Sequence, residues 1–221
     1  MDAQKCVFKN VCNKAPNGCS DSCLRYIQFN RLLELSNLPK SLQSPIKLYE
    51  VEADKVAYKR LNEIRKDITN FVKDGKCLYI CSNICGNAKT SWAAKLMLRY
   101  FYENWKNSYD VTKGLFVHIP TLLIDLKNFS NPPEYLDRIK DAELVIFDDL
   151  AATNRLTDFE HEQLLQFIDY RISNNLSCIF TSNITNYELL KQIYGGRLAS
   201  RVFNGSEVIT FYSNDFRVCR S

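Results

Sequence analysis

The chain has 221 residues, of which 46% are hydrophobic and 24% are charged, which excludes a long disordered tail and predicts one main domain with a small appendage. Its formal net charge of +4 permits contact with nucleic acid without indicating it, because nucleic-acid-binding domains usually carry a stronger basic excess. No stretch approaches the ~20 apolar residues that span a bilayer, and the N-terminus lacks the apolar core of a secretory signal. We therefore expect a cytoplasmic protein with no membrane partner.

The nine cysteines favour metal ligation or buried thiols, because the cytoplasm keeps disulfides reduced. Four of them bracket a Pro16-Asn17-Gly18 turn, and their spacing suits a tetrahedral zinc site made by Cys6, Cys12, Cys19 and Cys23. Zinc would stabilise a segment that has few large apolar side chains. An iron–sulfur cluster and unligated thiols are the alternatives. Cys77, Cys81 and Cys85 are not interpreted as a metal site, because four residues of a strand span ~13 Å.

Apolar residues at helical spacing predict helices over residues 24 to 36 and 53 to 73, with a linker over residues 37 to 52. Strands and helices then alternate, which predicts a parallel sheet with helices on both faces. The strands are predicted at 78 to 81, 115 to 119, 144 to 148, 177 to 182 and 207 to 212, and the helices at 90 to 105, 120 to 128, 158 to 174 and, as short pieces, across 186 to 203. We therefore expect an α/β protein with a cysteine-rich module over residues 1 to 36 and a main domain over residues 53 to 221.

The segment LYICSNICGNAKT, residues 78 to 90, is typical of a strand that enters a phosphate-binding loop. In G-x-x-x-x-G-K-[ST] loops, backbone N–H groups surround the phosphates, the lysine reaches the β and γ phosphates and the hydroxyl ligates Mg²⁺. Asn83 and Ala88 replace the first and last glycines, and an ordinary strand-to-helix turn is the alternative. The loop predicts an ATP or ADP site made by Asn83, Ile84, Cys85, Gly86, Asn87, Ala88, Lys89, Thr90 and Ser91.

Two acids end the apolar segment ELVIFDDL, residues 143 to 150, which is typical of a buried parallel strand. Ligands of α/β sheets bind at such strand ends. Asp148 would hold Mg²⁺ through water, and Asp149 would orient and deprotonate the attacking water. A turn after a core strand is the alternative.

Two further segments carry polar side chains that suit a triphosphate. Asn183 ends a strand at Thr181-Ser182-Asn183, where an amide can contact both the γ phosphate and the attacking water, although Ser-Asn is also a common turn. Residues 195 to 203, GGRLASRVF, place Arg197 and Arg201 on one helix face, from which they can reach a nucleotide held by a neighbouring subunit. A solvated basic face is the alternative.

Taken in order, NICGNAKT, VIFDDL, IFTSN, GGRLASRVF and VITFYSNDFR resemble the AAA+ ATPases. They are more closely similar to the DnaC/DnaI family of replicative helicase loaders, bacterial or phage encoded, followed by the IstB-type transposition ATPases. The resemblance covers roughly residues 37 to 217 and implies a three-layer AAA+ core with a five-stranded parallel sheet and no C-terminal lid domain. It implies catalytic roles for Lys89, Asp149, Asn183 and Arg201, Mg²⁺ ligation by Thr90 and Asp148, and a nucleotide contact in cis by Arg217.

The resemblance also implies a function: a weak, switch-type ATPase that self-associates with ATP and places a DnaB-type replicative helicase on single-stranded DNA. The cysteine-rich module resembles the zinc-bearing, helicase-binding domain of the DnaI branch. A degraded-site adaptor without useful ATPase activity and an IstB-like transposition ATPase are the alternatives. The adaptor is motivated by Asn83 and Ala88, because an alanine at residue 88 is strained by roughly 1 kcal/mol or more if that position needs a positive φ.

DNA contacts are expected near residues 120 to 140, where Lys127, Arg138 and Lys140 are basic, but none of these is assigned to DNA. His118 and His161 are expected to be structural.

Overall fold

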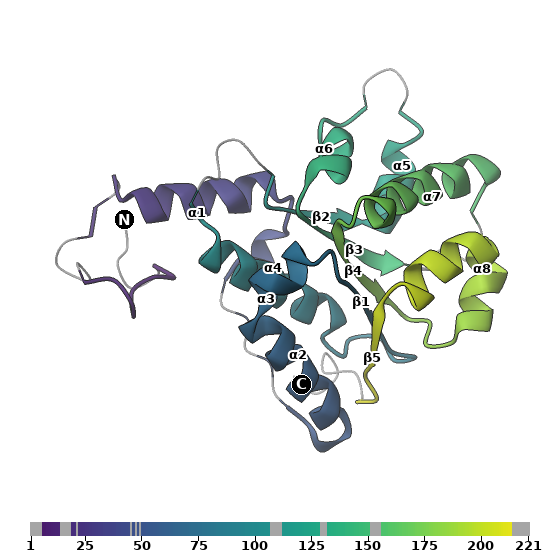
Figure 1. Cartoon of the computed structure of the whole chain (residues 1–221), viewed down its shortest axis with the longest axis horizontal. Helices are drawn as coiled ribbons and strands as arrows, with labels where there is room; N and C mark the ends of the chain where they lie inside the picture. The colour runs from purple at the N-terminus through teal and green to yellow at the C-terminus, as the bar shows by residue number, and fades with distance from the viewer. Residues whose placement is uncertain are drawn as a thin grey trace.

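A five-stranded parallel sheet forms the centre of the protein (Figure 1). The computed structural model describes residues 6–13, 19–20, 22–44, 46, 48, 50–106, 112–128, 132–150 and 156–213. The strand order is β2-β3-β4-β1-β5, and every pairing is parallel. The strands are β1 (Cys77–Cys81), β2 (Gly114–His118), β3 (Leu144–Leu150), β4 (Ser177–Ser182) and β5 (Glu207–Thr210). The predicted five-stranded parallel sheet is confirmed.

Helices cover both faces of this sheet (Figure 1). One face carries α1 (Leu24–Leu35), α2 (Lys55–Lys66), α3 (Ile68–Lys73) and α4 (Lys89–Glu103). The other face carries α5 (Ile119–Asp125), α6 (Tyr135–Asp141), α7 (Asp158–Ser173) and α8 (Tyr187–Ala199). Short 3₁₀ turns at Lys40–Leu42 and Glu52–Asp54 and a π-helical turn at Ser200–Asn204 complete the described elements. None of the described helices is long and apolar enough to cross a membrane.

Side-chain alternation along the strands creates two hydrophobic cores. In β1, Leu78 and Ile80 contribute to the core beneath α4, whereas Tyr79 contributes to the core beneath α7 and α8. The five residues of β1 are all buried, as expected for a central parallel strand covered on both faces. The three-layer α/β architecture is therefore confirmed.

The described part of the cysteine-rich segment packs against the main body. The ring of Phe8 lies 5.0 Å from that of Tyr102 and 5.6 Å from that of Phe29. Beyond α1, the Ser36 carbonyl accepts a hydrogen bond from the Phe116 N–H of edge strand β2 at 2.7 Å. Phe8 and Phe29 thus share one core with α4, and the domain boundaries at residues 36 and 52 stay a prediction.

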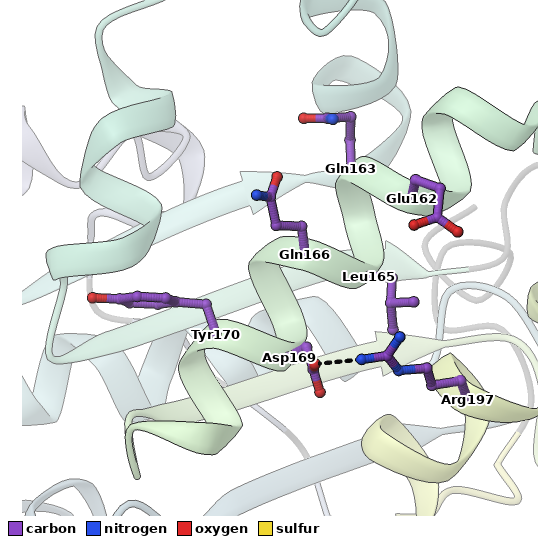
Figure 2. A pocket seen from close by; sticks show the side chains of 7 residues that line it. All are labelled: Glu162, Gln163, Leu165, Gln166, Asp169, Tyr170 and Arg197. Carbon is purple, nitrogen blue, oxygen red and sulfur yellow. Dashed lines mark hydrogen bonds and ion pairs between the residues drawn. The ribbon is translucent and has the colours of Figure 1, made fainter.

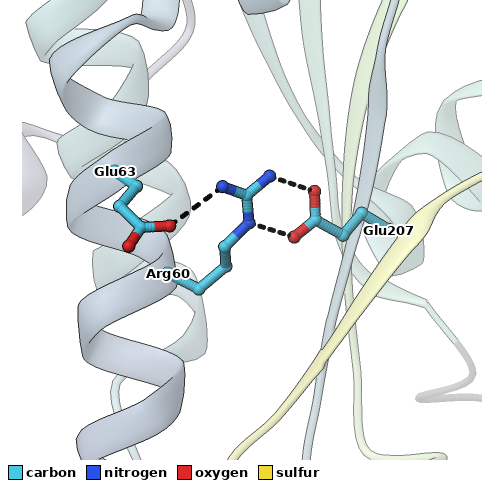
Figure 3. A network of polar contacts seen from close by, with 3 residues as sticks. All are labelled: Arg60, Glu63 and Glu207. Atoms are coloured by element: carbon cyan, nitrogen blue, oxygen red, sulfur yellow. Dashed lines mark hydrogen bonds and ion pairs between the residues drawn. The ribbon is translucent and has the colours of Figure 1, made fainter.

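Two polar clusters fasten elements that are distant in sequence. Arg60 of α2 donates to both carboxylate oxygens of Glu207 on edge strand β5, at 2.5 and 2.9 Å, and to Glu63 at 3.0 Å (Figure 3). On the other face, the fully buried Arg171 donates from Nη1 to the carbonyls of Ile139 and Ala142 at 2.8 and 2.7 Å. Its Nη2 donates to the Ser177 carbonyl at 2.7 Å, so one guanidinium holds α6, α7 and β4 together.

The structure differs from the predicted elements in three places. The helix predicted over residues 53 to 73 is broken at Asp67, whose φ of −123° and ψ of 32° are not helical and whose side chain accepts from Asn70. Helix α6 was not predicted, because it has seven residues and buries only Ile139. Strand β5 ends early because the backbone N–H groups of Tyr212 and Ser213 donate to the Asp54 carboxylate at 2.6 and 3.2 Å.

Candidate nucleotide site

The carboxyl ends of the strands bring the predicted site residues to one edge of the sheet. Cys81 at the end of β1 pairs in register with Ser182 of β4, and His118 at the end of β2 pairs with Asp148 of β3. The loop before α4, the two acids and Asn183 all follow these positions. This edge is where parallel α/β sheets bind their ligands.

The phosphate loop, residues 82 to 88, is organised by buried side chains. The Ser82 hydroxyl accepts from the Ile84 N–H at 3.1 Å and from the amide of Asn87, and both Ser82 and Asn87 are fully buried. Gly86 and Ala88 have φ values of 75° and 71°, so the chain turns twice through the left-handed region before α4 begins. Glycine adopts this region freely, whereas alanine is strained in it.

Backbone donors remain available at the start of α4. Among the described residues, none accepts a hydrogen bond from the backbone N–H groups of residues 85 to 88. Such N–H groups at the N-terminus of a 15-residue helix form a binding site for an anion. The loop therefore offers the donors that a phosphate requires.

The ammonium group of Lys89 lies within the loop. Its Nζ donates to the Ile84 carbonyl at 3.0 Å and to Asn87 Oδ1 at 3.1 Å, and the residue is only 8% exposed. These oxygens hold the positive charge beside the free N–H groups, where an anion would approach.

Asp148 is buried beside two hydroxyl groups. One belongs to Thr90, the predicted Mg²⁺ ligand, and the other belongs to Thr181 of β4. Its Oδ1 accepts from Thr181 Oγ1 at 2.7 Å, and a hydrogen bond links it to the Thr90 side chain. Burial raises the pKa of this carboxyl, and the charge of Asp149 adds to the rise, while the two threonine hydrogen bonds and His118 oppose it. A buried carboxylate next to a hydroxyl is a donor set that suits Mg²⁺.

Asp149 is held in a strained conformation at the edge. Its φ is 61°, at a β-bulge where the β3–β4 register shifts between Phe147 and Leu150. Its N–H donates to Thr181 Oγ1 at 2.9 Å, and its half-exposed carboxylate lies 4.0 Å from His118 Nε2. Strained residues cluster at functional sites, and this bulge turns the second acid toward solvent.

His118 and Thr181 lie next to the two acids at this edge, although neither was given a role in the predicted site. His118 ends β2, and its Nδ1 contacts the Thr121 hydroxyl at 2.9 Å. The rule that located the acids, the carboxyl end of a parallel strand, would have located His118 as well.

Asn183 lies directly after β4, at the same edge and partly exposed. Two residues later, the Thr185 hydroxyl donates to Asn83 Oδ1 at 2.7 Å. The asparagine that replaces the first glycine of the loop therefore binds the connection between β4 and α8.

Comparison with known proteins defines the fold. No protein-family model matches the sequence, and no curated protein does. Among solved structures, a DnaC helicase loader matches with a TM-score of 0.62 and 20% identity, over 75% of this chain and 94% of that one. A DnaI structure matches with a TM-score of 0.61 and 22% identity, over 84% and 98% of the two chains. The fold is that of the DnaC and DnaI helicase loaders.

The loader fold extends to a replication initiator. A DnaA protein bound to AMPPCP and single-stranded DNA matches with a TM-score of 0.57 and 14% identity, over 76% of this chain and 49% of that one. The resemblance drawn from the sequence motifs is thus confirmed at the level of the fold.

Arg197 and Arg201 lie in the helical segment that follows Gly195. This segment is away from the sheet edge that carries the predicted site residues. Arg197 Nη2 donates to Asp169 Oδ2 of α7 at 3.0 Å, and Arg201 Nε lies 2.7 Å from Asp169 Oδ1 (Figure 2 shows the first pair). Arg217, the predicted contact in cis, lies outside the described residues. Neither Arg197 nor Arg201 contacts Lys89, Asp148 or Asp149 of its own chain in the described structure.

The described cysteines of the N-terminal segment do not support the predicted metal site. The described residues contain no group of three or more His, Cys, Asp or Glu side chains that could hold a metal ion, and Cys6, Cys12, Cys19 and Cys23 are free thiols. Desolvation raises the pKa of the Cys19 thiol, as do, to a smaller extent, Cys12, Cys6 and Cys23. The thiols are near enough to influence one another, but they do not converge as zinc or iron–sulfur ligands. The turn at residues 16 to 18 lies outside the described residues.

The basic residues considered for DNA already have protein partners. Lys127 pairs with Glu160 at 3.0 Å, Arg138 donates to the Leu35 carbonyl, and Lys140 lies 5.6 Å from the centre of the Tyr170 ring. His161, expected to be structural, contacts the Tyr194 carbonyl at 2.7 Å. These contacts favour structural roles and assign no DNA surface.

Proposed function

We propose that this protein is an ATP-dependent loader that binds a DnaB-type replicative helicase and helps to place it on single-stranded DNA. The observation that carries the proposal is the meeting of Lys89, Asp148 and Asn183 at one sheet edge, within a fold shared with DnaC and DnaI. Loaders of this kind act as switches, so we expect slow ATP turnover.

Each residue at the edge has a proposed role in binding and hydrolysis. The free N–H groups of residues 85 to 88 and the Lys89 ammonium bind the phosphates. Thr90 and Asp148 hold Mg²⁺, which would neutralise charge on the phosphate oxygens. The exposed Asp149 carboxylate accepts a proton from the attacking water, and the Asn183 amide orients that water. Arg217 is proposed to contact the nucleotide in cis.

The N-terminal segment is the proposed contact with the helicase. Several of its large apolar side chains are exposed, with Val11 at 56%, Leu24 at 57% and Ile27 at 41%. Exposed apolar side chains gathered on one segment are typical of a protein interaction site. Phe8 and Phe29 are unavailable for this contact because they are buried in the core.

A degraded-site adaptor is the second candidate, and the backbone at Ala88 favours it. The alanine has a φ of 71° at the N-cap of α4, where its methyl group adds bulk to the loop that must close on the phosphates. The adaptor would bind the helicase without using ATP.

Two measurements separate these functions. Binding of a fluorescent ATP analogue to the wild-type chain and to Lys89→Ala tests the site, and loss of binding in the variant supports the loader. Capture of a DnaB-type helicase tests the N-terminal segment, with the full chain compared to the variants Leu24→Glu and Ile27→Glu. Val56→Glu is the matched surface control, because Val56 is 83% exposed and lies outside that segment. Helicase capture without ATP binding would establish the adaptor. Failure to capture the helicase, with ATP bound, would refute the loader and favour the IstB-like transposition ATPase.

A further inference from the structure

Both arginines of the segment after Gly195 pair with one carboxylate. Arg197 is 68% exposed and donates a hydrogen bond to Asp169 Oδ2 at 3.0 Å (Figure 2). Arg201 is 42% exposed and approaches Asp169 Oδ1 with Nε, but Oδ1 is buried without a hydrogen-bond partner in the described structure. Asp169 therefore binds Arg197 by a hydrogen bond and attracts Arg201 mainly by charge.

The way in which Arg201 meets Asp169 leaves its outer nitrogens available. The closest approach is through Nε, and the two terminal nitrogens make no hydrogen bond to any described residue. A guanidinium held at Nε keeps its Nη pair in a fork that can bind a second anion, such as a phosphate. This geometry orients the cation without occupying its outer donors.

Helix α7 fixes the segment that carries the arginines at two points. Gly195, with a φ of 74° and a ψ of 162°, breaks α8 just before Arg197. His161 of α7 contacts the Tyr194 carbonyl at the break, and Asp169, about two helical turns along α7, contacts the arginines. Arg201 itself lies in the π-helical turn Ser200–Asn204. The break and the two contacts set the direction in which Arg201 points.

A polar hollow lies beside the pair and gives another molecule access. Its volume is about 510 Å³, and Gln163, Gln166 and Tyr170 of α7 line it together with Asp169 and Arg197 (Figure 2). Neither Arg197 nor Arg201 contacts Lys89, Asp148 or Asp149 of its own chain in the described structure, because both pair with Asp169. In the proposed ATPase, an arginine from a second copy of the chain would stabilise the transition-state charge at that site.

We propose that Asp169 is a positioning residue that orients Arg201 toward a triphosphate held by a second copy of this chain. The inference rests on the proposed ATPase function and adds a residue to it. Asp169 touches neither the nucleotide nor the reacting atoms, and it acts through the direction and charge of Arg201.

Mixing two inactive variants tests whether Arg201 acts between chains. Arg201→Ala keeps the nucleotide edge but lacks the arginine, and Lys89→Ala keeps the arginine but lacks the phosphate contact. Each alone should hydrolyse ATP at least about tenfold more slowly than the wild type, because an arginine supplied in trans contributes strongly to phosphoryl transfer. Their mixture should recover hydrolysis. No recovery, with an active wild type, would overturn action between chains.

The same mixture then isolates Asp169. Adding Asp169→Ala to the Lys89→Ala chain should reduce the recovered rate at least about fivefold, whereas Asp169→Asn, which keeps an oxygen near Nε, should recover part of it. In the otherwise wild-type chain, Asp169→Ala should lower kcat and leave the Kd for a fluorescent ATP analogue unchanged. Asp158→Ala, an exposed acid on the same helix that does not line the hollow, is the matched control. Full recovery with Asp169→Ala would overturn the proposal.

Failure of the proposed function would look different. If the wild type binds ATP without hydrolysing it, sedimentation of the same variants with ATP becomes the readout, and self-association unaffected by Asp169→Ala overturns the inference. Absence of ATP binding by the wild type would remove the nucleotide site itself and overturn both proposals. Circular dichroism of Asp169→Ala distinguishes misfolding from mispositioning, and Asp169→Asn provides a second variant.

Discussion

Replacing Ala88 with glycine should both stabilise the protein and strengthen ATP binding. Ala88 has a φ of 71°, and a residue with a Cβ in the left-handed region costs roughly 1–2 kcal/mol. Glycine relieves this strain but gives about 0.4–1 kcal/mol more entropy to the unfolded chain. The free energy of unfolding should therefore rise by up to about 1.6 kcal/mol, which corresponds to at most about 6 °C in Tm for a chain of this size.

The effect on ATP affinity is separable from strain. If the Ala88 methyl group keeps one backbone N–H from a phosphate oxygen, glycine restores a hydrogen bond to a charged group worth about 1.5–3 kcal/mol. Because about 1.4 kcal/mol is a factor of ten in Kd, binding should tighten at least about tenfold. Thermal unfolding without nucleotide measures the strain, and titration with a fluorescent ATP analogue measures the contact.

Asn83→Gly is the matched control, because it also restores a glycine of the loop motif. The backbone of Asn83 does not have a positive φ, and its Oδ1 accepts a hydrogen bond from Thr185. We expect this variant to be less stable by about 0.5–1 kcal/mol. A Tm that falls in Ala88→Gly, or that moves in the same direction in both variants, would refute the reasoning from backbone strain. A higher Tm with unchanged ATP affinity would refute the blocked phosphate contact alone.

Three other substitutions test the structure. Asp148→Asn should raise the Tm at pH 7, because burial raises the pKa of Asp148 and the wild type loses stability as the pH rises through that pKa. The difference in Tm between the variant and the wild type should disappear below about pH 4. A difference in Tm that does not depend on pH would contradict this. Arg171→Met leaves buried carbonyls of Ile139, Ala142 and Ser177 without donors and should cost about 3 kcal/mol or more in denaturant unfolding, so a loss under about 1 kcal/mol would argue against the buried network. Arg60→Ala should cost at most about 1 kcal/mol, less in high salt, because its ion pairs are half exposed, and a larger loss would mean that α2 depends on them.

The sequence predicted the parts of the fold that depend on local pattern. Uniform apolar runs such as β3 identify buried parallel strands, and the acids at its end follow from where such strands bind ligands. A seven-residue helix such as α6 has no periodicity long enough to detect, and the break at Asp67 depends on how α2 and α3 each pack on α4. These features are set by tertiary contacts.

The partner that a side chain contacts was harder to predict from the sequence than the element on which the residue lies. The spacing of Arg197 and Arg201 shows that they share a face, but the pairing with Asp169 joins α7 to α8 and leaves no pattern in either segment. The cysteine spacing suggested a tetrahedral site, yet spacing alone does not fix the direction of four thiols. Ala88 was easier to identify, because the replacement of a motif glycine was visible in the sequence, and the structure shows the positive φ at which an alanine is strained.

The contact between Asn83 and Thr185 gives the altered loop a mechanical consequence. Thr185 is followed by Asn186, which caps α8 by accepting from the N–H groups of Glu188 and Leu189. A loop that shifts around an incoming phosphate would pull on this connector and hence on the helix that leads to Arg197. A glycine at position 83 has no side chain with which to transmit such a displacement. In the proposed assembly, Asn83 would therefore link nucleotide binding in one chain to the segment that carries Arg197.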